Sequence, residues 1–545
     1  MKTINLKEYG ILPNTDITLP LAKMLKDMQS DKQAKIIEFE SGIYHINSAQ
    51  AEKPLLYVTN TMGDEEWKKG EEKNRNCVGI LLENISNLTI DFGNSIFLID
   101  GQMTNIAILN CDNVVIKNAI IKPTNPNMHE MKVIKKGLTY IDYKLDKDSS
   151  YQKDTKGYCF VGTDYKYNFF ESRYVAYWTG KVPSDNINSV WRVAHPMLGA
   201  YKVTEIGNHT FRIKYLIAPN YKKGDRFYIY DARRKYQGIF IDRSKDIIID
   251  NLEQNFNYGL CVVCQDSENF SLLNSKFCPA KDSEKLMASV ADFVQICVCR
   301  GDIKLDNNYF EGAGDDTLNV HGIHYEYDIV DSKTINAKFS HKQTNSFCPI
   351  REGDTLNFIS KESLNLIKTN IVVSAKLIDR HTIQIVLKNE VDKLSNAVIE
   401  NASSCPNVIF SNNVMNRIIT RGILMTTSGK VEIVNNRFEN TSMHSILISD
   451  DAKSWYESGF VRDVLIQGNY FGRCVGYTLN ILPENKIHKD YVHSNIRFID
   501  NTIQSEGQGG YFMKSSKDIT IKGNKIIGKT KQTKIINCDN INIED

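Results

Sequence analysis

One short pattern recurs along most of the chain and constrains its fold more than any other feature of the sequence. Each copy begins with a polar or charged residue, often Asn or Asp, which precedes alternating apolar positions, and Asn or Gly lies near a turn. Alternation of this kind is typical of a strand with one buried face. Eleven copies occupy residues 87–90, 113–116, 246–249, 269–272, 302–305, 407–410, 430–433, 463–466, 495–498, 518–521 and 540–543.

The spacing of the copies defines the period of the repeat. First residues are 23 positions apart at Asp246 and Asn269 (269 − 246) and 22 apart at Asp518 and Asn540 (540 − 518). This period, with strand-type patterning and no helical segment, predicts a coil of parallel strands in which each rung buries its inward residues against its neighbours. Leucine-rich repeats share the period but need leucine at fixed positions, which this chain lacks. The sequence therefore predicts an all-β fold, a right-handed parallel β-helix.

Two long gaps interrupt the repeat. They span 133 positions between Asn113 and Asp246 (246 − 113) and 105 between Asp302 and Asn407 (407 − 302). Both contain alternating strand-like runs, and the phrases at residues 224–229 and 353–358 are similar to each other. We expect each gap to fold as a small antiparallel β-barrel-like domain inserted into the coil, where it forms a wall around a site.

These features predict five consecutive parts of the chain. Apolar residues at helical spacing in residues 17–30 predict a short amphipathic helix that covers the open end of the coil. The parts are an N-terminal cap with the first rungs (1–122), an inserted β-barrel-like domain (123–237), β-helix with catalytic acids (238–322), a second inserted β domain (323–402) and the C-terminal rungs (403–545).

Charge and composition narrow the classes of partner. The chain has 67 basic and 65 acidic side chains, a formal charge of +2, so it has no electrostatic footprint for nucleic acid or an anionic membrane. A neutral substrate is therefore expected. No run approaches the roughly 18 apolar residues that a membrane span requires. The twelve cysteines lack the paired spacing of a zinc site and are expected to be small buried residues in a reducing compartment.

The N-terminal residues lack the apolar core of a signal peptide. We therefore expect a cytoplasmic protein, unless an export signal has been removed. The oligomeric state is left open.

The densest polar cluster contains Asp292, Asp315, Asp316 and, a few residues on, His321. Fourteen residues after the start of a copy come Asp316 (316 − 302), Arg421 (421 − 407), His444 (444 − 430) and Tyr477 (477 − 463). Asp292 takes the same place if the extra residues of its rung fall in residues 281–288. The repeat thus predicts a column of side chains at the mouth of the second strand: Asp292, Asp316, Arg421, His444 and Tyr477, with Asp315 beside it.

A column of acids favours proton chemistry. Neighbouring parallel strands lie about 4.8 Å apart, so the three carboxylates repel one another and one of them holds its proton more tightly. A protonated acid then stands beside an ionised base near neutral pH. Acids also cap turns, which is the expectation for Asp246 or Asp463, but a cluster of three costs stability without a function. For His321, Arg421 and His444, substrate binding and a packing or charge-balancing role both stay open.

Residues 449–459 form a polar loop around Trp455. An indole face beside the Glu457 carboxylate is typical of a platform that stacks on a sugar and binds its hydroxyls. An aromatic ring that packs on its own rung is the alternative.

Residues 310–312, 315–322, 421–424, 445–451 and 454–459 resemble glycoside hydrolase family 110. The resemblance runs from about residue 239 to 471, and Thr317 stands where the family more often has Pro. It implies a β-helix with β-barrel-like insertions and an exo-acting, metal-independent, inverting α-1,3-galactosidase that releases terminal galactose from structures such as the blood group B antigen. The family's acidic constellation maps onto Asp292, Asp315 and Asp316. No metal or other cofactor is expected.

The repeat and the resemblance together predict the site residues. Asp292, Asp315 and Asp316 are predicted to be catalytic, and we expect substrate contacts from Asn319, His321, Arg421, His444, Trp455 and Glu457. By analogy with the polygalacturonases, Asp315 is predicted to be the general acid, with Asp292 and Asp316 activating water. A separation of one rung by itself favours retention, but we expect inversion because side chains diverge from the rung.

Two other classes of function remain as alternatives. A polygalacturonase-like β-helix hydrolase would need a basic subsite and the Asn-Thr-Asp and Arg-Ile-Lys sequences beside the acids, whereas here these sequences occur only at residues 14–16 and 212–214, outside the acidic cluster. A non-catalytic carbohydrate-binding solenoid would need the aromatic loop but not the acids. The linkage, and a preference for linear or branched glycans, stay open.

Overall fold

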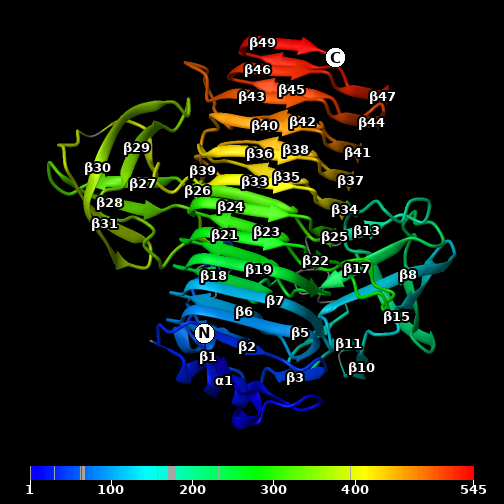
Figure 1. The fold of residues 1–545 in the computed structure, drawn as a ribbon. Helices are drawn as coiled ribbons and strands as arrows, with labels where there is room; N and C mark the ends of the chain where they lie inside the picture. The colour runs from blue at the N-terminus through cyan, green and yellow to red at the C-terminus, as the bar shows by residue number, and fades with distance from the viewer. Residues whose placement is uncertain are drawn as a thin grey trace.

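Parallel strands stack into a long coil that carries one lobe on each side (Figure 1). The computed structural model describes residues 2–29, 31–61, 63, 68–155, 157–169, 180–230, 233–392 and 394–545. Two sheets run the length of the coil, one of 21 strands and one of 12. The N-terminus lies at one end of the stack and the C-terminus at the other.

All eleven predicted copies lie in strands that pair in parallel with the next copy. The register continues across both insertions, since Ile247 pairs with Val114 and Ile303 pairs with Val408. The predicted parallel coil is therefore confirmed, whereas its right-handed sense stays a prediction. The strands are β5 (Ser86–Asp100), β7 (Asp112–Pro123), β19 (Lys245–Gln254), β21 (Glu268–Leu273), β24 (Arg300–Asp306), β33 (Asn407–Ser411), β36 (Lys430–Val434), β40 (Asp463–Gln467), β43 (His493–Ile499), β46 (Ser516–Lys522) and β49 (Asp539–Glu544).

Each rung then continues into shorter strands. The 21-stranded sheet starts with β1 (Lys2–Ile4), β2 (Lys35–Glu38) and β3 (Ile43–Asn47). It is completed by β22 (Lys276–Phe277), β25 (Tyr309–Ala313), β34 (Val414–Ile418), β37 (Arg437–Thr441), β41 (Tyr470–Cys474), β44 (Thr502–Glu506) and β47 (Lys525–Lys529). The other long sheet contains β4 (Val78–Glu83), β6 (Thr104–Leu109), β18 (Ile239–Asp242), β20 (Val262–Gln265), β23 (Val294–Cys297), β26 (Leu318–Ile323), β35 (Ile423–Met425), β38 (Ile446–Ile448), β42 (Leu479–Ile481), β45 (Tyr511–Lys514) and β48 (Lys534–Ile536).

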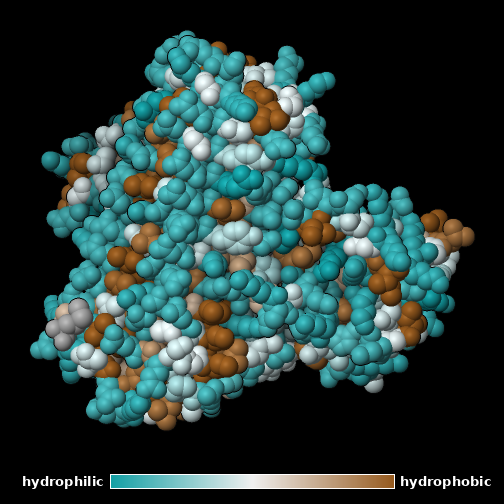
Figure 2. Space-filling model, turned by 45° about the vertical axis from the view of Figure 1, so that its right-hand side comes forward, coloured by the Kyte–Doolittle hydropathy of each residue, from teal (hydrophilic) through white to brown (hydrophobic). Residues whose placement is uncertain are grey.

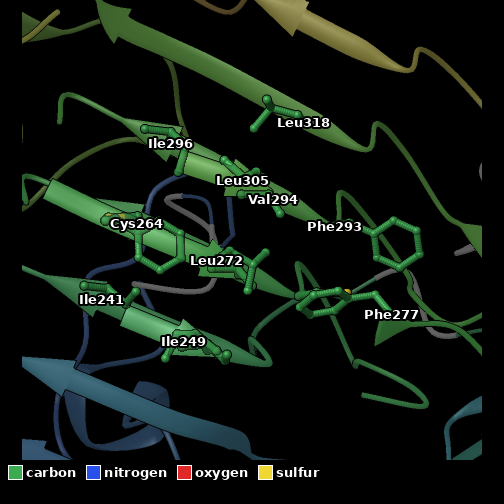
Figure 3. Close-up of a cluster of buried hydrophobic side chains, with 14 of the residues drawn as sticks. Ile241, Ile249, Cys264, Leu272, Phe277, Phe293, Val294, Ile296, Leu305 and Leu318 are labelled. Atoms are coloured by element: carbon green, nitrogen blue, oxygen red, sulfur yellow. The ribbon is translucent and has the colours of Figure 1, made fainter. Parts of the chain in front are cut away.

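The inward positions of successive rungs form the core. Ile249, Leu272 and Leu305 follow one another along one sheet, and all three are buried (Figure 3). Phe277 and Phe310 stack with ring centroids 5.5 Å apart. Each buried side chain of this size contributes roughly 1.5–3 kcal/mol. Repetition of such contacts at every rung holds the coil together. On the molecular surface shown in Figure 2, by contrast, hydrophobic residues lie in small scattered groups.

The polar residue that opens many copies has a structural reason. Asn113 and Asn269 have left-handed backbone conformations, with φ of 54° and 56°, which Asn tolerates better than most residues. Their side chains donate to the copy below, Asn113 to Asn87 and Asn269 to Asp246, each at 2.8 Å. A buried ladder of amides, absent from our expectations, runs through Asn308, Asn413, Asn436, Asn469, Asn501 and Asn524.

The predicted amphipathic helix is α1 (Thr18–Asp27), and residue 30 lies outside the described residues. It buries Leu21, Met24 and Leu25 and contacts β3 (Ile43–Asn47) and β4. The helix therefore covers the open end of the coil, as predicted. Also at this end are β1 (Lys2–Ile4), η1 (Leu6–Tyr9), β2 (Lys35–Glu38) and α3 (Glu71–Asn74).

The first insertion is antiparallel, as expected, but its described residues do not close into a barrel. They form an open seven-stranded sheet in the order β14-β13-β17-β8-β9-β16-β15 and a separate three-stranded sheet. The edge strand β14 has only two residues, too few to close the sheet. The strands are β8 (Met128–Lys136), β9 (Tyr140–Leu145), β10 (Tyr151–Asp154), β11 (Gly157–Val161), β12 (Lys166–Asn168), β13 (Gly180–Val182), β14 (Trp191–Arg192), β15 (Ala200–Gly207), β16 (Thr210–Tyr215) and β17 (Arg226–Tyr230).

The second insertion is a closed antiparallel barrel of six strands, which confirms that prediction. Apolar residues such as Ile335, Phe358 and Ile385 fill it. The strands are β27 (Tyr325–Ile329), β28 (Thr334–Phe339), β29 (Thr355–Ser360), β30 (Leu366–Asp379), β31 (Thr382–Leu387) and β32 (Ala397–Asn401). After the barrel, β39 (Glu457–Ser458) pairs antiparallel with the end of β26.

Two further observations concern the chain as a whole. The twelve cysteines all lie in described residues, none is in a disulfide, and most are buried. Among the described residues, no helix has both the length and the apolar character that crossing a membrane demands.

Candidate active site

Strand register places the five predicted residues in one column. The first residues of β23, β26, β35, β38 and β42 pair in series. The residues two positions before each strand therefore stack at the turn that enters this sheet, and backbone hydrogen bonds link them: Phe293 N–H donates to Asp316 O at 2.9 Å. The predicted column is confirmed: Asp292, Asp316, Arg421, His444 and Tyr477.

Asp316 is the most constrained of the three acids. It is 1% exposed, and its carboxylate accepts hydrogen bonds from the Arg421 backbone N–H at 2.9 Å and from Arg421 Nε and Nη2 at 2.9 and 2.5 Å. Thr420 Oγ1 donates to the same carboxylate at 2.5 Å. Burial by itself lowers the pKa of Arg421, but the charge of Asp316 outweighs it, so that pKa lies above its usual value. The Asp316 carboxylate is thus held in place by a fixed guanidinium group.

Asp292 has the opposite environment. It is 7% exposed, and its Oδ1 accepts from the Asp316 backbone N–H at 2.9 Å. Burial, followed by the charges of Asp315 and Asp316, raises the pKa of Asp292 well above its usual value. Its surroundings therefore make Asp292 hold a proton more tightly than an exposed aspartate does.

Asp315 is the acid that reaches solvent, with 23% of its side chain exposed. Its Oδ2 lies 3.2 Å from Nη2 of Arg192, which belongs to β14 of the first insertion. Hydrogen bonds anchor the segment before Arg192 on the C-terminal rungs, since Arg417 Nε donates to Ile187 O at 2.8 Å and Ser442 Oγ donates to Val190 O. The insertion thus supplies a cation to the acids.

One oxygen from each of the three carboxylates lies within 4.8 Å of the others. Our expectation that the side chains diverge from the rung is therefore wrong: Asp292, Asp315 and Asp316 converge. The reason is that Arg192 and Arg421 offset part of their negative charge. Oxygens at this spacing have the geometry to bind a cation, but two of the three acids already contact guanidinium groups.

Asn319, His321 and Glu457 form a second polar group, on β26 and β39. Asn319 Nδ2 donates to Glu457 Oε1 at 3.2 Å, and His321 Nε2 lies 3.8 Å from the same oxygen. His321 Nδ1–H donates to Gly322 O at 2.8 Å, so Nε2 accepts from Gln295 Nε2 at 2.9 Å. These contacts bring the three predicted substrate ligands together.

His444 lies one rung beyond Arg421. Its Nδ1 accepts from the Tyr477 backbone N–H at 2.9 Å, and Asn480 Nδ2 lies 3.0 Å from its Nε2. Burial, then the charge of Arg421, lowers the pKa of His444 to about 4. His444 is therefore neutral rather than a cation at neutral pH.

A cleft of ≈ 310 Å³ opens beside Arg421. Trp455, 42% exposed, and Glu457 lie on its wall, and the ring of His341 from the second insertion packs on Trp455 with centroids 4.5 Å apart. Gln343, two residues on, accepts from Arg234 Nη2 at 3.1 Å. The predicted residues thus lie in one continuous region, from the column to the Trp455 loop.

Comparison with known proteins agrees with this arrangement. Residues 334–395, within the closed barrel, match the family described as GLAA-B beta-barrel domain II. The chain is 30% identical over 506 residues to α-1,3-galactosidase A of Bacteroides fragilis, covering 91% of this chain and 82% of that protein. It is 29% identical over 525 residues to α-1,3-galactosidase A of Bacteroides thetaiotaomicron, covering 93% and 90%. The chain belongs to the α-1,3-galactosidase family, glycoside hydrolase family 110.

This family 110 chain is also similar to α-1,3-galactosidase B of Bacteroides thetaiotaomicron, at a lower identity. The two are 26% identical over 553 residues, which cover 97% of this chain and 86% of that protein. The match extends through both insertions and the outer rungs. The recognised relationship is therefore wider than the central region from which we inferred it.

Sequence reasoning missed several residues of the family 110 site. Arg192 and Arg234 come from the first insertion and its return to the coil, where no repeat period relates them to the acids. Thr420 was detectable, since it directly precedes Arg421 in the column. Tyr228 and Tyr230 on β17 are also buried close to Arg192, and burial raises the pKa of both phenols.

Proposed function

We propose that the chain is an exo-acting glycoside hydrolase that releases terminal α-1,3-linked galactose from oligosaccharides by an inverting acid/base mechanism. The names of the Bacteroides relatives support the reaction class. The observation that carries the proposal is the convergence of Asp292, Asp315 and Asp316 within 4.8 Å, with their charges set by two guanidinium groups. Carboxylates in this arrangement are suited to proton transfer.

The proposed proton path follows from exposure and charge. Asp315, which alone among the acids reaches solvent to this extent, gives its proton to the glycosidic oxygen as the bond to the anomeric carbon breaks. Water forms the new bond to that carbon, and the Asp292 carboxylate, which is ionised at this step, takes the proton that the water loses; its raised pKa makes it a stronger base than an ordinary aspartate. Asp316, held in place by Arg421, orients the water. Transfer of the proton from Asp292 back to Asp315 restores the starting state.

Inversion is part of the proposal, although the spacing of the acids by itself favours retention. Retention requires a second carboxylate that is free to bond covalently to the sugar. Arg421 and Thr420 already bind the Asp316 carboxylate, and Asp292 is buried. Proton NMR of the first sugar released from an α-galactoside tests the stereochemistry: β-galactose supports inversion, and α-galactose overturns it.

The Trp455 cleft is the proposed binding site for the sugar. The indole supplies an apolar face, Glu457 accepts hydrogen bonds from hydroxyls, and a volume of ≈ 310 Å³ is at the lower end of the range for ligand pockets. Exo-action is supported by the second insertion, because His341 and Gln343 contact Trp455 and Arg234 and so wall one side. The proposed partner is accordingly a glycan with terminal α-galactose.

The decisive experiment is turnover of a panel of α-linked galactosides, p-nitrophenyl, linear and fucose-branched, by the unmodified chain and by Asp315→Asn. Release of galactose that falls at least 10³-fold in Asp315→Asn supports catalysis by the acids. Asp246→Asn is the matched control, because Asp246 caps an exposed turn on the same coil. No turnover of any galactoside by the unmodified chain would favour a carbohydrate-binding solenoid, and turnover unchanged in Asp315→Asn would overturn the catalytic assignment.

A further inference from the structure

We propose that His324 and Asp450 are positioning residues, which hold the Trp455 loop (residues 450–458) in place on the wall of the cleft and thereby set the affinity for substrate. The effect on affinity rests on the proposed function, whereas the effect on the loop does not. Both side chains are 0% exposed; Asp450 lies on the wall of the cleft, and His324 lies behind it.

The pair is short, and within the described part of the chain the second polar atom of each side chain has no hydrogen bond. His324 Nε2 lies 2.6 Å from Asp450 Oδ1. Among the described residues, His324 Nδ1 and Asp450 Oδ2 have no hydrogen-bond partner. Each side chain thus depends on the other, and removing either leaves a buried polar group unsatisfied, which is strongly destabilising.

The pair joins both ends of the Trp455 loop to the coil. The loop begins at Asp450, and it returns to pair with β26, where Glu457 lies opposite Ile323 (Figure 1, β39 beside β26). The backbone N–H of His324 donates to Tyr456 O at 2.8 Å. His324 therefore contacts the start of the loop through its ring and the end of the loop through its backbone.

The loop itself is closed by Asp451. Its carboxylate accepts from the backbone N–H groups of Lys453, Ser454 and Trp455 at 2.7 to 3.2 Å. The Asp451 N–H also donates to Glu457 O at 3.0 Å. The loop is thus a rigid unit, and its orientation is set by the attachment at His324 and Asp450.

The surroundings explain why a histidine suits this place. Burial lowers the pKa of His324, but the charge and hydrogen bond of Asp450 outweigh it, so the pKa lies above its usual value. Glu400, on the barrel strand β32, faces the pair and its pKa is raised by burial. Arg462 and Asp451 are the other charged groups nearby. A charged histidine is thus stabilised between the barrel and the loop.

The consequence concerns binding more than chemistry. Glu457 and Trp455 lie on the wall of the cleft, whereas the acids lie in the rungs of the column. A loop released from His324 moves these two side chains and leaves Asp292, Asp315 and Asp316 in place. We therefore expect His324→Ala to raise KM for a galactoside about tenfold, while kcat changes less than about threefold; small displacements of binding groups have effects of this size.

The test uses three variants of the full chain. His324→Ala removes the bond, His324→Gln retains an amide donor near the position of Nε2, and His129→Ala is the matched control, since His129 is equally buried but lies in the first insertion. Steady-state kinetics on p-nitrophenyl α-galactoside give KM and kcat. Acrylamide quenching of Trp455, taken as the difference between each variant and its Trp455→Phe counterpart, reports the loop without substrate.

The proposal requires stronger Trp455 quenching and higher KM in His324→Ala, with both restored toward the original values in His324→Gln and unchanged in His129→Ala. Unaltered Trp455 quenching in His324→Ala overturns it, as does a fall in kcat that equals the fall in kcat/KM. If His324→Ala does not fold, Asp450→Asn provides the same comparison with an isosteric side chain. If the unmodified chain hydrolyses no galactoside, the proposed function fails, yet the quenching result still decides the positioning role.

Discussion

Arg421 binds the carboxylate of Asp316, its neighbour on the adjacent rung, through Nε, Nη2 and its backbone N–H. Side-chain and backbone donors from one residue thus converge on one buried acid. The pairing follows from the register of β26 and β35. Leu318 pairs with Ile423, so Asp316 and Arg421, two positions earlier, lie next to each other on neighbouring rungs. The anion is consequently fixed in place before any substrate arrives.

Removing this cation is expected to be costly. Arg421→Met leaves Asp316 buried and unpaired, so we expect the free energy of unfolding to fall by about 3–5 kcal/mol. Arg497→Met is the control, because Arg497 pairs with Asp463 at an exposed position and its loss should change stability by less than about 1 kcal/mol. Urea unfolding measures both; equal losses would contradict a special role for the Arg421 pair.

The raised pKa of Asp292 is expected to make the free energy of unfolding depend on pH. Its raised pKa means that the folded state binds the proton more tightly than the unfolded chain does, so the free energy of unfolding decreases as pH rises from about 4 toward the folded pKa. Asp292→Asn removes the titration and retains an oxygen that accepts from Asp316 N–H. We expect this variant to gain stability relative to the original chain as pH rises. Urea unfolding from pH 4 to 8 would refute the prediction if the two curves stay parallel.

The contact of Arg192 with Asp315 leads us to expect that the first insertion contributes to catalysis. Because its guanidinium lies 3.2 Å from Asp315 at a partly exposed site, Arg192→Ala should lower kcat by about 10–100-fold and change the melting temperature little. Lys222→Ala removes an exposed pair with Asp185 in the same insertion and serves as the control. Equal kcat values for Arg192→Ala and Lys222→Ala would show that Arg192 does not contribute to catalysis.

The position of Trp455 on the wall of the cleft leads us to expect that it binds the sugar. We expect Trp455→Ala to raise KM for α-galactosides about tenfold with kcat nearly constant, and Trp455→Phe to retain most of the affinity, because an aromatic face remains. Initial rates over a range of substrate concentrations measure both constants. A KM unchanged in Trp455→Ala would show that the indole packs on His341 without binding the sugar.

The sequence by itself determined the coil, the cap and the column. Parallel pairing converts a fixed offset in the repeat into a neighbour in space, so Asp292, Asp316 and Arg421 could be placed together by counting. The Asn or Asp at many of the turns made the start of each copy recognisable in the sequence, because these residues tolerate the left-handed backbone that the turn needs.

Only the tertiary structure decided the charges and the walls of the site. Arg192 precedes Asp315 by 123 positions (315 − 192), and their contact depends on how the insertion packs, which no period encodes. The same holds for the open first sheet and for the convergence of the carboxylates, which we expected to diverge. Repeat patterns specify backbone pairing along the stack, whereas burial and charge balance between distant segments arise from side-chain packing in the folded chain.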